Sequence, residues 1–143
     1  MHADPFDLER FVAAQRSNYD DALAELRAGR KTSHWMWYVL PQLRGLGRSP
    51  MAQRYGIESL DEARAYLAHP VLGSRLRACV DAVNALPGDD PVSVLGAVDA
   101  AKFRSCLTLF LAAAPAEPWL CAALAKYFGG QGDGRTRALL RDA

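Results

Sequence analysis

The chain has 143 residues, of which 50% are hydrophobic and 23% charged, and its formal net charge is +1. A chain of this length and composition can bury a core without disulfides or metals, so we expect one domain spanning residues 1–143. The small net charge argues against bulk binding to nucleic acid or to a membrane surface. The longest apolar run, residues 107–115, is too short to cross a bilayer, which takes ~20 residues.

Three cysteines, Cys79, Cys106 and Cys121, are an odd number and stand among apolar residues. We expect buried free thiols, which suit a reducing compartment. The first residues lack the basic start and apolar core of a signal peptide, so the sequence predicts a cytoplasmic protein. The spacing of cysteine and histidine is not typical of a metal site, and we expect no metal and no other cofactor.

Charge is unevenly distributed along the chain. Residues 26–57, which we call the acid-free segment, carry six basic side chains and no acidic one. The other 11 basic and all 16 acidic residues lie outside it, so the segment is +6 and the remainder −5. Because the segment also holds four aromatic residues, its composition favours an anionic ligand, including an aromatic one. The alternative is that its cations pair with acidic residues of other helices.

Two helices are predicted before residue 32. Asp7 is placed to cap the first helix, whose buried face would carry Leu8 and Phe11. Asn18 opens a second helical pattern, and Gly29 is placed to end it.

Residues 36–40 are followed by Pro41, which stops or kinks a helix. We expect a short helix because the surroundings are helical, although strand-forming residues in the run also allow one extended segment. In a helix, Trp35 and Trp37 point in nearly opposite directions, so one would pack in the core and the other would face a cleft or a partner. In an extended segment, both would share a face.

A polar residue followed by proline recurs at the start of later apolar helical patterns. It occurs as Ser49-Pro50, His69-Pro70, Asp90-Pro91 and Glu117-Pro118. Proline is well tolerated at the first helical position, whose N–H has no partner within the helix. Ser59 and Glu62 have the spacing of a capping box. The pattern after Pro91 is expected to break near Gly96 and to resume to Ala114 as the central buried helix.

The glycine-rich residues 129–134 form a predicted loop, and Asp133 is placed to cap a last short helix that carries Arg135 and Arg137. No stretch of five or more residues alternates convincingly as a strand does. The predicted fold class is all-α: a compact single-domain bundle of about seven to nine helices, several of them short.

The runs GRKTSHWMWY at residues 29–38 and LPQLRGLG at 40–47 are the most distinctive of the chain. They resemble the small bacterial proteins of domain of unknown function family 1810. Further similar pieces are FDL at residues 6–8, YLAHP at 66–70, TLF at 108–110 and KYFGG at 126–130. The resemblance covers nearly the whole chain and implies a compact helical fold with no established activity. Some members carry the label calpastatin, but that inhibitor is a disordered repeat protein, whereas this chain has the composition of a packed core.

A looser resemblance concerns residues 129–140, GGQGDGRTRALL. They are similar to the closing Gly/Asp/Arg segment of helical N-glycosidases that act on ADP-ribose-like and nucleotide-derived compounds. Those enzymes carry an acidic catalytic residue in an early aromatic segment. Here His34 stands near that place, so an acid for such chemistry would have to come from elsewhere in the chain.

Two functional hypotheses follow, and the sequence leaves open whether the protein is an enzyme. The first is a pocket for a small anionic, nucleotide-like ligand, with N-glycosidase-type hydrolysis as its chemistry if there is a reaction. His34 is its candidate catalytic residue; alternatively, the ring nitrogens of His34 bind the backbone near the turn. The candidate ligand-binding residues are Trp35, Trp37, Tyr38, Gln42, Arg44, Arg48, Arg54, Tyr55, Arg135 and Arg137. The second hypothesis is a protein–protein interaction module that uses exposed Trp and Arg.

Overall fold

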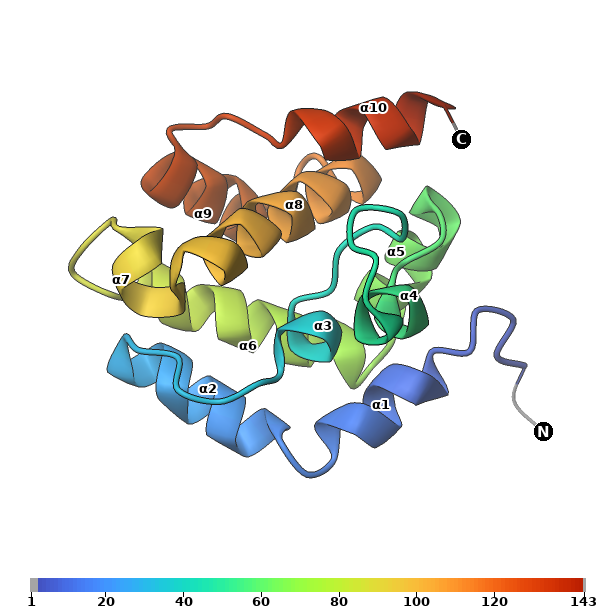
Figure 1. Ribbon diagram of the computed structural model, residues 1–143, viewed down its shortest axis with the longest axis horizontal. Helices are drawn as coiled ribbons and strands as arrows, with labels where there is room; N and C mark the ends of the chain where they lie inside the picture. Colours follow the sequence, from blue (N-terminus) through green and yellow to red (C-terminus); the bar gives the residue numbers. More distant parts are fainter. Residues whose placement is uncertain (1–2, 143) are drawn as a thin grey trace.

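The computed structural model describes residues 3–142, which contain ten helices and no β-strand (Figure 1). This confirms the predicted all-α fold. The helices of seven or more residues are α1 (Glu9–Gln15), α2 (Tyr19–Ala28), α5 (Leu60–Ala68), α6 (Leu72–Asn84), α8 (Ala97–Ala113), α9 (Pro118–Phe128) and α10 (Gly134–Asp142). The short ones are α3 (Met36–Val39), α4 (Pro50–Tyr55) and α7 (Pro91–Leu95).

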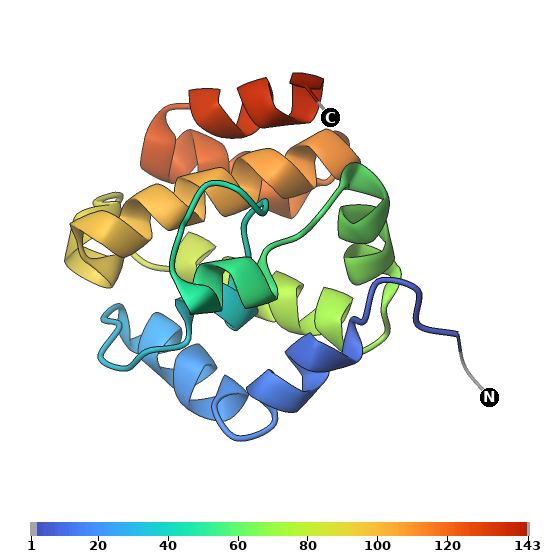
Figure 2. The same cartoon turned by 45° about the vertical axis from the view of Figure 1, so that its right-hand side comes forward.

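Helix α8 is the central element of the bundle. It packs against α5, α7, α9 and α10, while α6 packs against α2, α5 and α9. Figures 1 and 2 show the resulting order, with α10 at the top, α8 below it, α6 in the middle, and α1 and α2 at the bottom. The chain between α2 and α5, which holds most of the acid-free segment, passes across this stack from α2 toward α8 and α10 (Figure 1).

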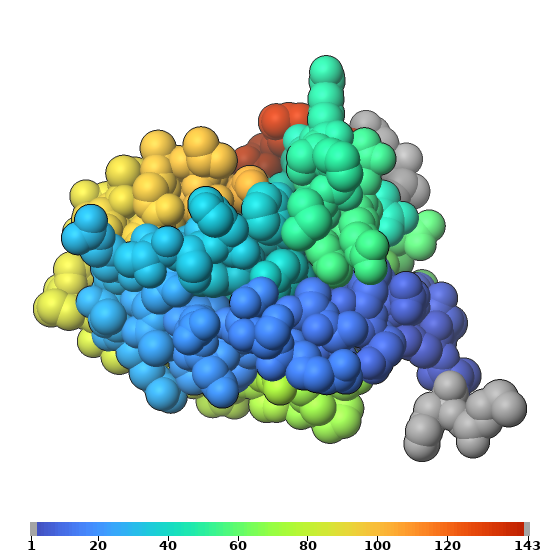
Figure 3. All heavy atoms as spheres, turned by 60° about the horizontal axis from the view of Figure 1, so that its bottom comes forward, coloured from blue at the N-terminus to red at the C-terminus, as the bar shows by residue number. Residues whose placement is uncertain are grey.

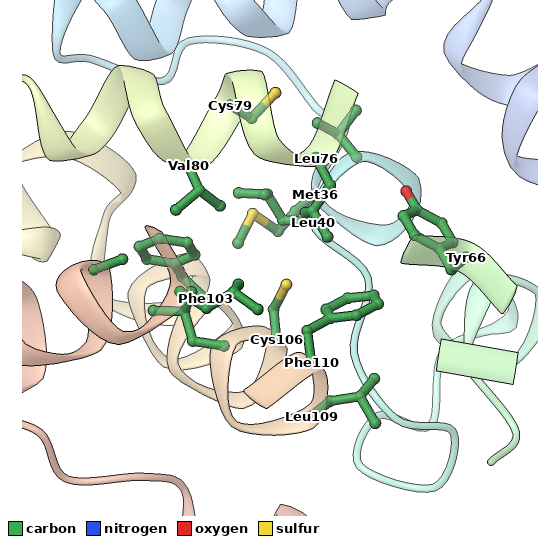
Figure 4. Packing of buried hydrophobic residues seen from close by; sticks show 14 of the residues in the cluster. Met36, Leu40, Tyr66, Leu76, Cys79, Val80, Phe103, Cys106, Leu109 and Phe110 are labelled. Carbon is green, nitrogen blue, oxygen red and sulfur yellow. The ribbon is translucent and has the colours of Figure 1, made fainter. Parts of the chain in front are cut away.

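The core is built mainly on α8 and α6. Phe103 and Phe110 of α8 face the apolar side of α6, and Met36 and Leu40 of the acid-free segment insert beside them (Figure 4). Burying each such side chain contributes roughly 1.5–3 kcal/mol. Part of the most distinctive sequence of the chain therefore serves packing.

The thiols divide into two kinds. Cys79 and Cys106 are buried as predicted, and burial raises the pKa of Cys79 to about 12 and also raises that of Cys106. Cys121 is exposed, so the prediction of a buried thiol is wrong there. It lies on the outward face of α9, whose buried face carries Leu120, Leu124 and Tyr127 instead.

The first helix begins differently from the prediction. Asp7 does not cap α1; its backbone is in the left-handed region with φ of 51°, and its carbonyl oxygen accepts from Arg10. The Asp4 carboxylate accepts from the backbone N–H groups of Leu8 and Glu9 at 2.8 and 3.0 Å, and so takes the capping role. A turn closed by the Asp7 N–H on the Asp4 carbonyl brings that carboxylate into place.

Most later helix starts agree with the sequence. The side chains of Ser49, Ser59 and Asp90 each accept from a backbone N–H of the following helix. The His69-Pro70 pair is an exception, because α6 begins two residues after the proline and the His69 Nδ1 accepts from the first N–H groups. Within residues 3–142, no helix is both long enough and apolar enough to span a membrane.

Candidate functional site

Glu25 holds the beginning of the distinctive run. Its Oε1 accepts from the backbone N–H groups of Thr32 and Ser33 at 2.7 and 2.9 Å and from the Trp35 Nε1 at 3.0 Å, and its Oε2 accepts from the Ser33 hydroxyl. Burial raises the pKa of Glu25, but these hydrogen bonds outweigh burial and hold the pKa at about 2. The Glu25 carboxylate is thus committed to positioning residues 32–35.

Residues 36–39 form the predicted short helix, and the two tryptophans separate as expected for a helix. Trp35 is 1% exposed and belongs to the core, whereas Trp37 is half-buried at the surface. A lysine lies over each indole ring: Lys31 Nζ is 5.0 Å from the Trp35 centroid, and Lys102 Nζ is 5.2 Å from that of Trp37. Both lysines reach the Asp99 carboxylate, at 2.8 and 3.8 Å.

Tyr38 and Tyr55 are also buried. Their rings are 5.3 Å apart in an edge-to-face arrangement, and the Tyr38 hydroxyl accepts from Asn18 and donates to the His34 carbonyl oxygen. Burial raises the pKa of Tyr38. The His34 side chain is exposed, and its ring has no hydrogen-bond partner among the described residues.

Trp37, Gln42 and Tyr55 come together with Lys102 around a narrow crevice. Its volume is about 10 Å³, which is room for one water molecule. The structure therefore brings three of the candidate residues together, but not around a space that a nucleotide would fill.

A ligand-sized cleft lies nearby, between the N-terminal segment and helices α4 and α5. Its volume is about 400 Å³, within the usual range for small-molecule sites. We call it the arginine cleft; it is lined by Pro5, Phe6, Asp7, Arg10, Arg44, Arg54, Glu58 and Glu62. The blue N-terminal helices and the cyan-to-green acid-free segment meet on the face of the molecule that Figure 3 shows.

Arg10 closes the bottom of the arginine cleft. Its guanidinium pairs with the Glu62 carboxylate at 2.8 Å, and the two side chains are only 9% and 1% exposed. The same guanidinium donates to the carbonyl oxygens of Phe6, Asp7, Arg54 and Gly56. All three of its nitrogens are occupied, so Arg10 joins the N-terminal segment to α4 and α5 and is not free for a ligand.

Arg44 and Arg54 form the open rim. The Arg44 Nε donates to the Gln53 carbonyl at 3.1 Å, and the Arg54 guanidinium lies 5.6 Å from the Tyr55 ring centroid. Among the side chains that the structure describes, neither arginine has an acidic partner. The alternative, that the cations of this segment pair with acidic residues of other helices, holds for Lys31 but not for these two arginines.

A short backbone pairing fixes Arg44 at the cleft. Leu43 and Ile57 form an isolated parallel bridge, in which the Arg44 N–H donates to the Ile57 carbonyl at 2.8 Å. Gly56 allows this approach, because a Cβ at that position would lie 2.7 Å from the Arg44 Cα. The pairing sets the 41–49 turn against α4.

The acid-free segment has no carboxylate of its own, but two carboxylates from the chain before and after this segment line the arginine cleft. Asp7 comes from the N-terminal segment and Glu58 from the two residues that precede α5, and both are exposed. Sequence reasoning missed Phe6, Asp7, Arg10 and Glu58 as site residues, although the FDL piece at residues 6–8 was a signal for the first two. In the described part of the chain, no group of three or more His, Cys, Asp or Glu is placed to hold a metal ion.

The remaining candidate arginines, Arg48, Arg135 and Arg137, do not line the arginine cleft. Arg48 is exposed on the 41–49 turn, and the Arg135 Nη2 reaches the Leu46 carbonyl of that turn at 3.5 Å. Arg137 instead lies against Gly132 in the glycine-rich loop, where its guanidinium occupies the space that a Cβ would need. Arg44, Arg48 and Arg135 thus meet at the 41–49 turn, Arg54 shares the arginine cleft with Arg44, and Arg137 joins neither group.

Comparison with known proteins agrees with this architecture. The chain is similar to the conserved hypothetical protein Rv1873 from Mycobacterium tuberculosis, whose crystal structure superposes with a TM-score of 0.94 at 54% identity, over 96% of this chain and 99% of that chain. No curated protein matches the chain. The family described as Protein of unknown function (DUF1810) matches residues 5–140, which include the whole arginine cleft. The resemblance of the sequence to domain of unknown function family 1810 is confirmed, and the chain belongs to the DUF1810 family.

Proposed function

We propose that the arginine cleft binds a small anionic, nucleotide-like ligand. The observation that carries this proposal is that Arg44 and Arg54 line a cleft of about 400 Å³ with guanidinium groups that have no acidic partner among the described side chains. A guanidinium free of carboxylate partners suits bidentate binding of phosphate. The buried Arg10–Glu62 pair also lines the cleft, and because the two charges cancel, the pair adds no net charge to it.

The rest of the lining favours a nucleotide over a bare polyanion. Phe6 is half-buried and offers an apolar, aromatic surface to a base. Asp7 and Glu58 balance the charge of the two arginines and present acceptors to ribose hydroxyls or to base N–H groups. Such a mixture recognises a ligand with both phosphate and hydrogen-bond donors.

Thermal shift measurements test the proposal. AMP, ADP, UMP and ribose 5-phosphate are the probes, and a ligand at about 100 times its Kd should stabilise the protein by about 2.7 kcal/mol. The Arg44→Gln and Arg54→Gln variants should lose this shift. Arg16→Gln is the matched control, because Arg16 is exposed, pairs with Glu9 and does not line the cleft.

Two outcomes would overturn the proposal. One is that none of the four probes changes the melting temperature of the wild-type protein. The other is that a probe stabilises the wild-type protein and the two cleft variants equally.

The carboxylates of the cleft favour N-glycosidase-type hydrolysis as the chemistry of this site, if it has one. Such a reaction needs an acid that protonates the leaving base and a carboxylate that stabilises the sugar cation or activates water. Asp7 and Glu58 are the candidates, whereas His34 does not line the cleft and receives no role in this proposal. Release of free base from AMP, followed by chromatography, should disappear in Asp7→Asn and Glu58→Gln; binding without release would leave a binding protein.

The alternative function, a protein interaction module, would rest on Trp37 and the exposed arginines, because Trp35 is buried. A stable oligomer in light scattering that dissociates on Trp37→Ala would favour it. We also propose a cytoplasmic location, since the described cysteines are free thiols and one of them, Cys121, is exposed.

A further inference from the structure

A second cleft adjoins the arginine cleft. Its volume is about 390 Å³, and it lies between the start of α5 and the end of α10. We call it the leucine cleft; it is lined by Leu43, Arg44, Glu58, Ser59, Leu60, Asp61, Leu139 and Leu140. Arg44 and Glu58 line both clefts, so the two spaces share a wall.

The parallel bridge explains the shared wall. Leu43 and Ile57 are the paired residues, and they are 5% and 0% exposed. Because successive side chains of extended backbone point to opposite sides, the residues after them, Arg44 and Glu58, both point outward, and both are exposed. The Arg44 Nε is occupied by the Gln53 carbonyl, which leaves its two terminal nitrogens for a ligand at the boundary.

The two clefts differ in chemistry. The arginine cleft has a second cation, Arg54, without an acidic partner among the described side chains, whereas the leucine cleft adds four leucines to the shared Arg44. Asp61 also lines the leucine cleft, and it pairs with Arg64 at 3.2 Å. A second anionic group is therefore disfavoured in the leucine cleft, and an uncharged group with apolar or aromatic surface is favoured.

We infer that the ligand is a nucleotide whose phosphate carries a second, uncharged bulky group, as in a dinucleotide joined by a diphosphate. The phosphates lie at Arg44 and Arg54, one nucleoside occupies the arginine cleft, and the second group occupies the leucine cleft. This inference rests on the proposed function of the arginine cleft. Each cleft lies near the lower end of the usual size range of ligand sites, which fits one half of such a ligand.

Isothermal titration calorimetry with ADP and with diadenosine diphosphate tests the inference. Both probes contain adenosine and a diphosphate; the second has an additional nucleoside and one charge fewer. We expect diadenosine diphosphate to bind at least about tenfold more tightly, and Arg44→Gln to weaken both probes.

Two variants of the leucine cleft distinguish its contribution to binding from that of the arginine cleft. Leu60→Asp adds an acid at the first position of α5, where the helix dipole tolerates it, and should weaken diadenosine diphosphate by about tenfold while leaving ADP unchanged. Leu140→Ser, which removes apolar surface without adding charge, should act in the same direction and serves if Leu60→Asp fails to fold.

The outcomes distinguish the inference from the function on which it rests. Equal affinity for both probes, or equal weakening of both by the leucine-cleft variants, would overturn the inference and leave nucleotide binding in place. Absence of binding by ADP and by diadenosine diphosphate would overturn the proposed function as well.

Discussion

Glu25 shows how one side chain can position a whole run of residues. Its four hydrogen bonds reach Thr32, Ser33 and Trp35 across seven to ten positions of sequence. Replacement by Gln removes the charge and one acceptor, so we predict a loss of about 1.5–3 kcal/mol in the free energy of unfolding, measured with urea. Glu9→Gln is the control: Glu9 is 63% exposed and pairs weakly with Arg16, so its replacement should change stability by less than about 0.5 kcal/mol.

The same residue predicts a pH dependence. Although burial opposes ionisation, the hydrogen bonds lower the folded-state pKa of Glu25 to about 2, against an ordinary value of 4.5. Its stabilisation is therefore complete above pH 4.5 and disappears as the pH falls toward 2. Wild-type protein should lose more stability than Glu25→Gln between pH 6 and roughly pH 3, a range that covers the upper part of this titration. Parallel stability curves for the two proteins would show that the hydrogen bonds do not favour the carboxylate.

Arg10 provides a test of the buried pair. Replacing Arg10 by Met would leave the Glu62 carboxylate, which is 1% exposed, without its cation, and we predict a cost of about 3–5 kcal/mol in chemical denaturation. Arg16→Met changes an arginine that is 71% exposed and should cost far less. Similar costs for the two variants would contradict the role assigned to Arg10.

Rules that depend on nearby residues predicted the roles of individual residues well, but they did not predict contacts between distant segments. Ser49 and Asp133 cap helices as expected, because a cap depends on residues three positions away. The capping role of Asp4 in place of Asp7, and the position of Arg10 between four carbonyls, depend on how distant segments fold together. Sequence separation does not reveal such partners.

At the scale of helices, the proline and glycine pattern predicted most boundaries. The break at Gly96 and the long buried helix after it both occur, since they depend on backbone conformation and on an apolar surface all round. The 41–49 turn could not be placed in this way, because its position comes from the Leu43–Ile57 bridge and from contact with α10.

The crossing of α5 and α6 gives a prediction at this scale. A Cβ at Gly73 would lie 2.1 Å from the Leu67 carbonyl oxygen, so Gly73→Ala forces the helices apart despite the higher helix propensity of alanine. We predict a loss of about 1–3 kcal/mol or more in thermal or urea unfolding. Gly88→Ala is the matched control, because among the described residues no atom beyond its chain neighbours lies within 4 Å of the added Cβ, and it should be neutral or slightly stabilising. Equal effects of the two changes would rule out this close approach.

At the scale of the whole molecule, one part of the acid-free segment belongs to the core and another part faces a cleft. Trp35, Tyr38 and Tyr55 serve the core, whereas Arg44 and Arg54 turn outward to a cleft completed by the N-terminal segment and α5. The sequence suggested an anionic ligand from this segment alone. The structure adds the carboxylates and the aromatic side chain that other segments contribute to the same cleft.

The central claim is that a nucleotide binds in the arginine cleft, and amide chemical-shift mapping tests it most directly. Titration of isotopically labelled protein with ADP should shift the amide signals of residues 6–10, 43–45 and 54–62, and the Arg44→Gln variant should lose these shifts. Shifts confined to the crevice at Trp37 and Gln42 or to residues 129–134, or no shifts at all, would contradict the claim.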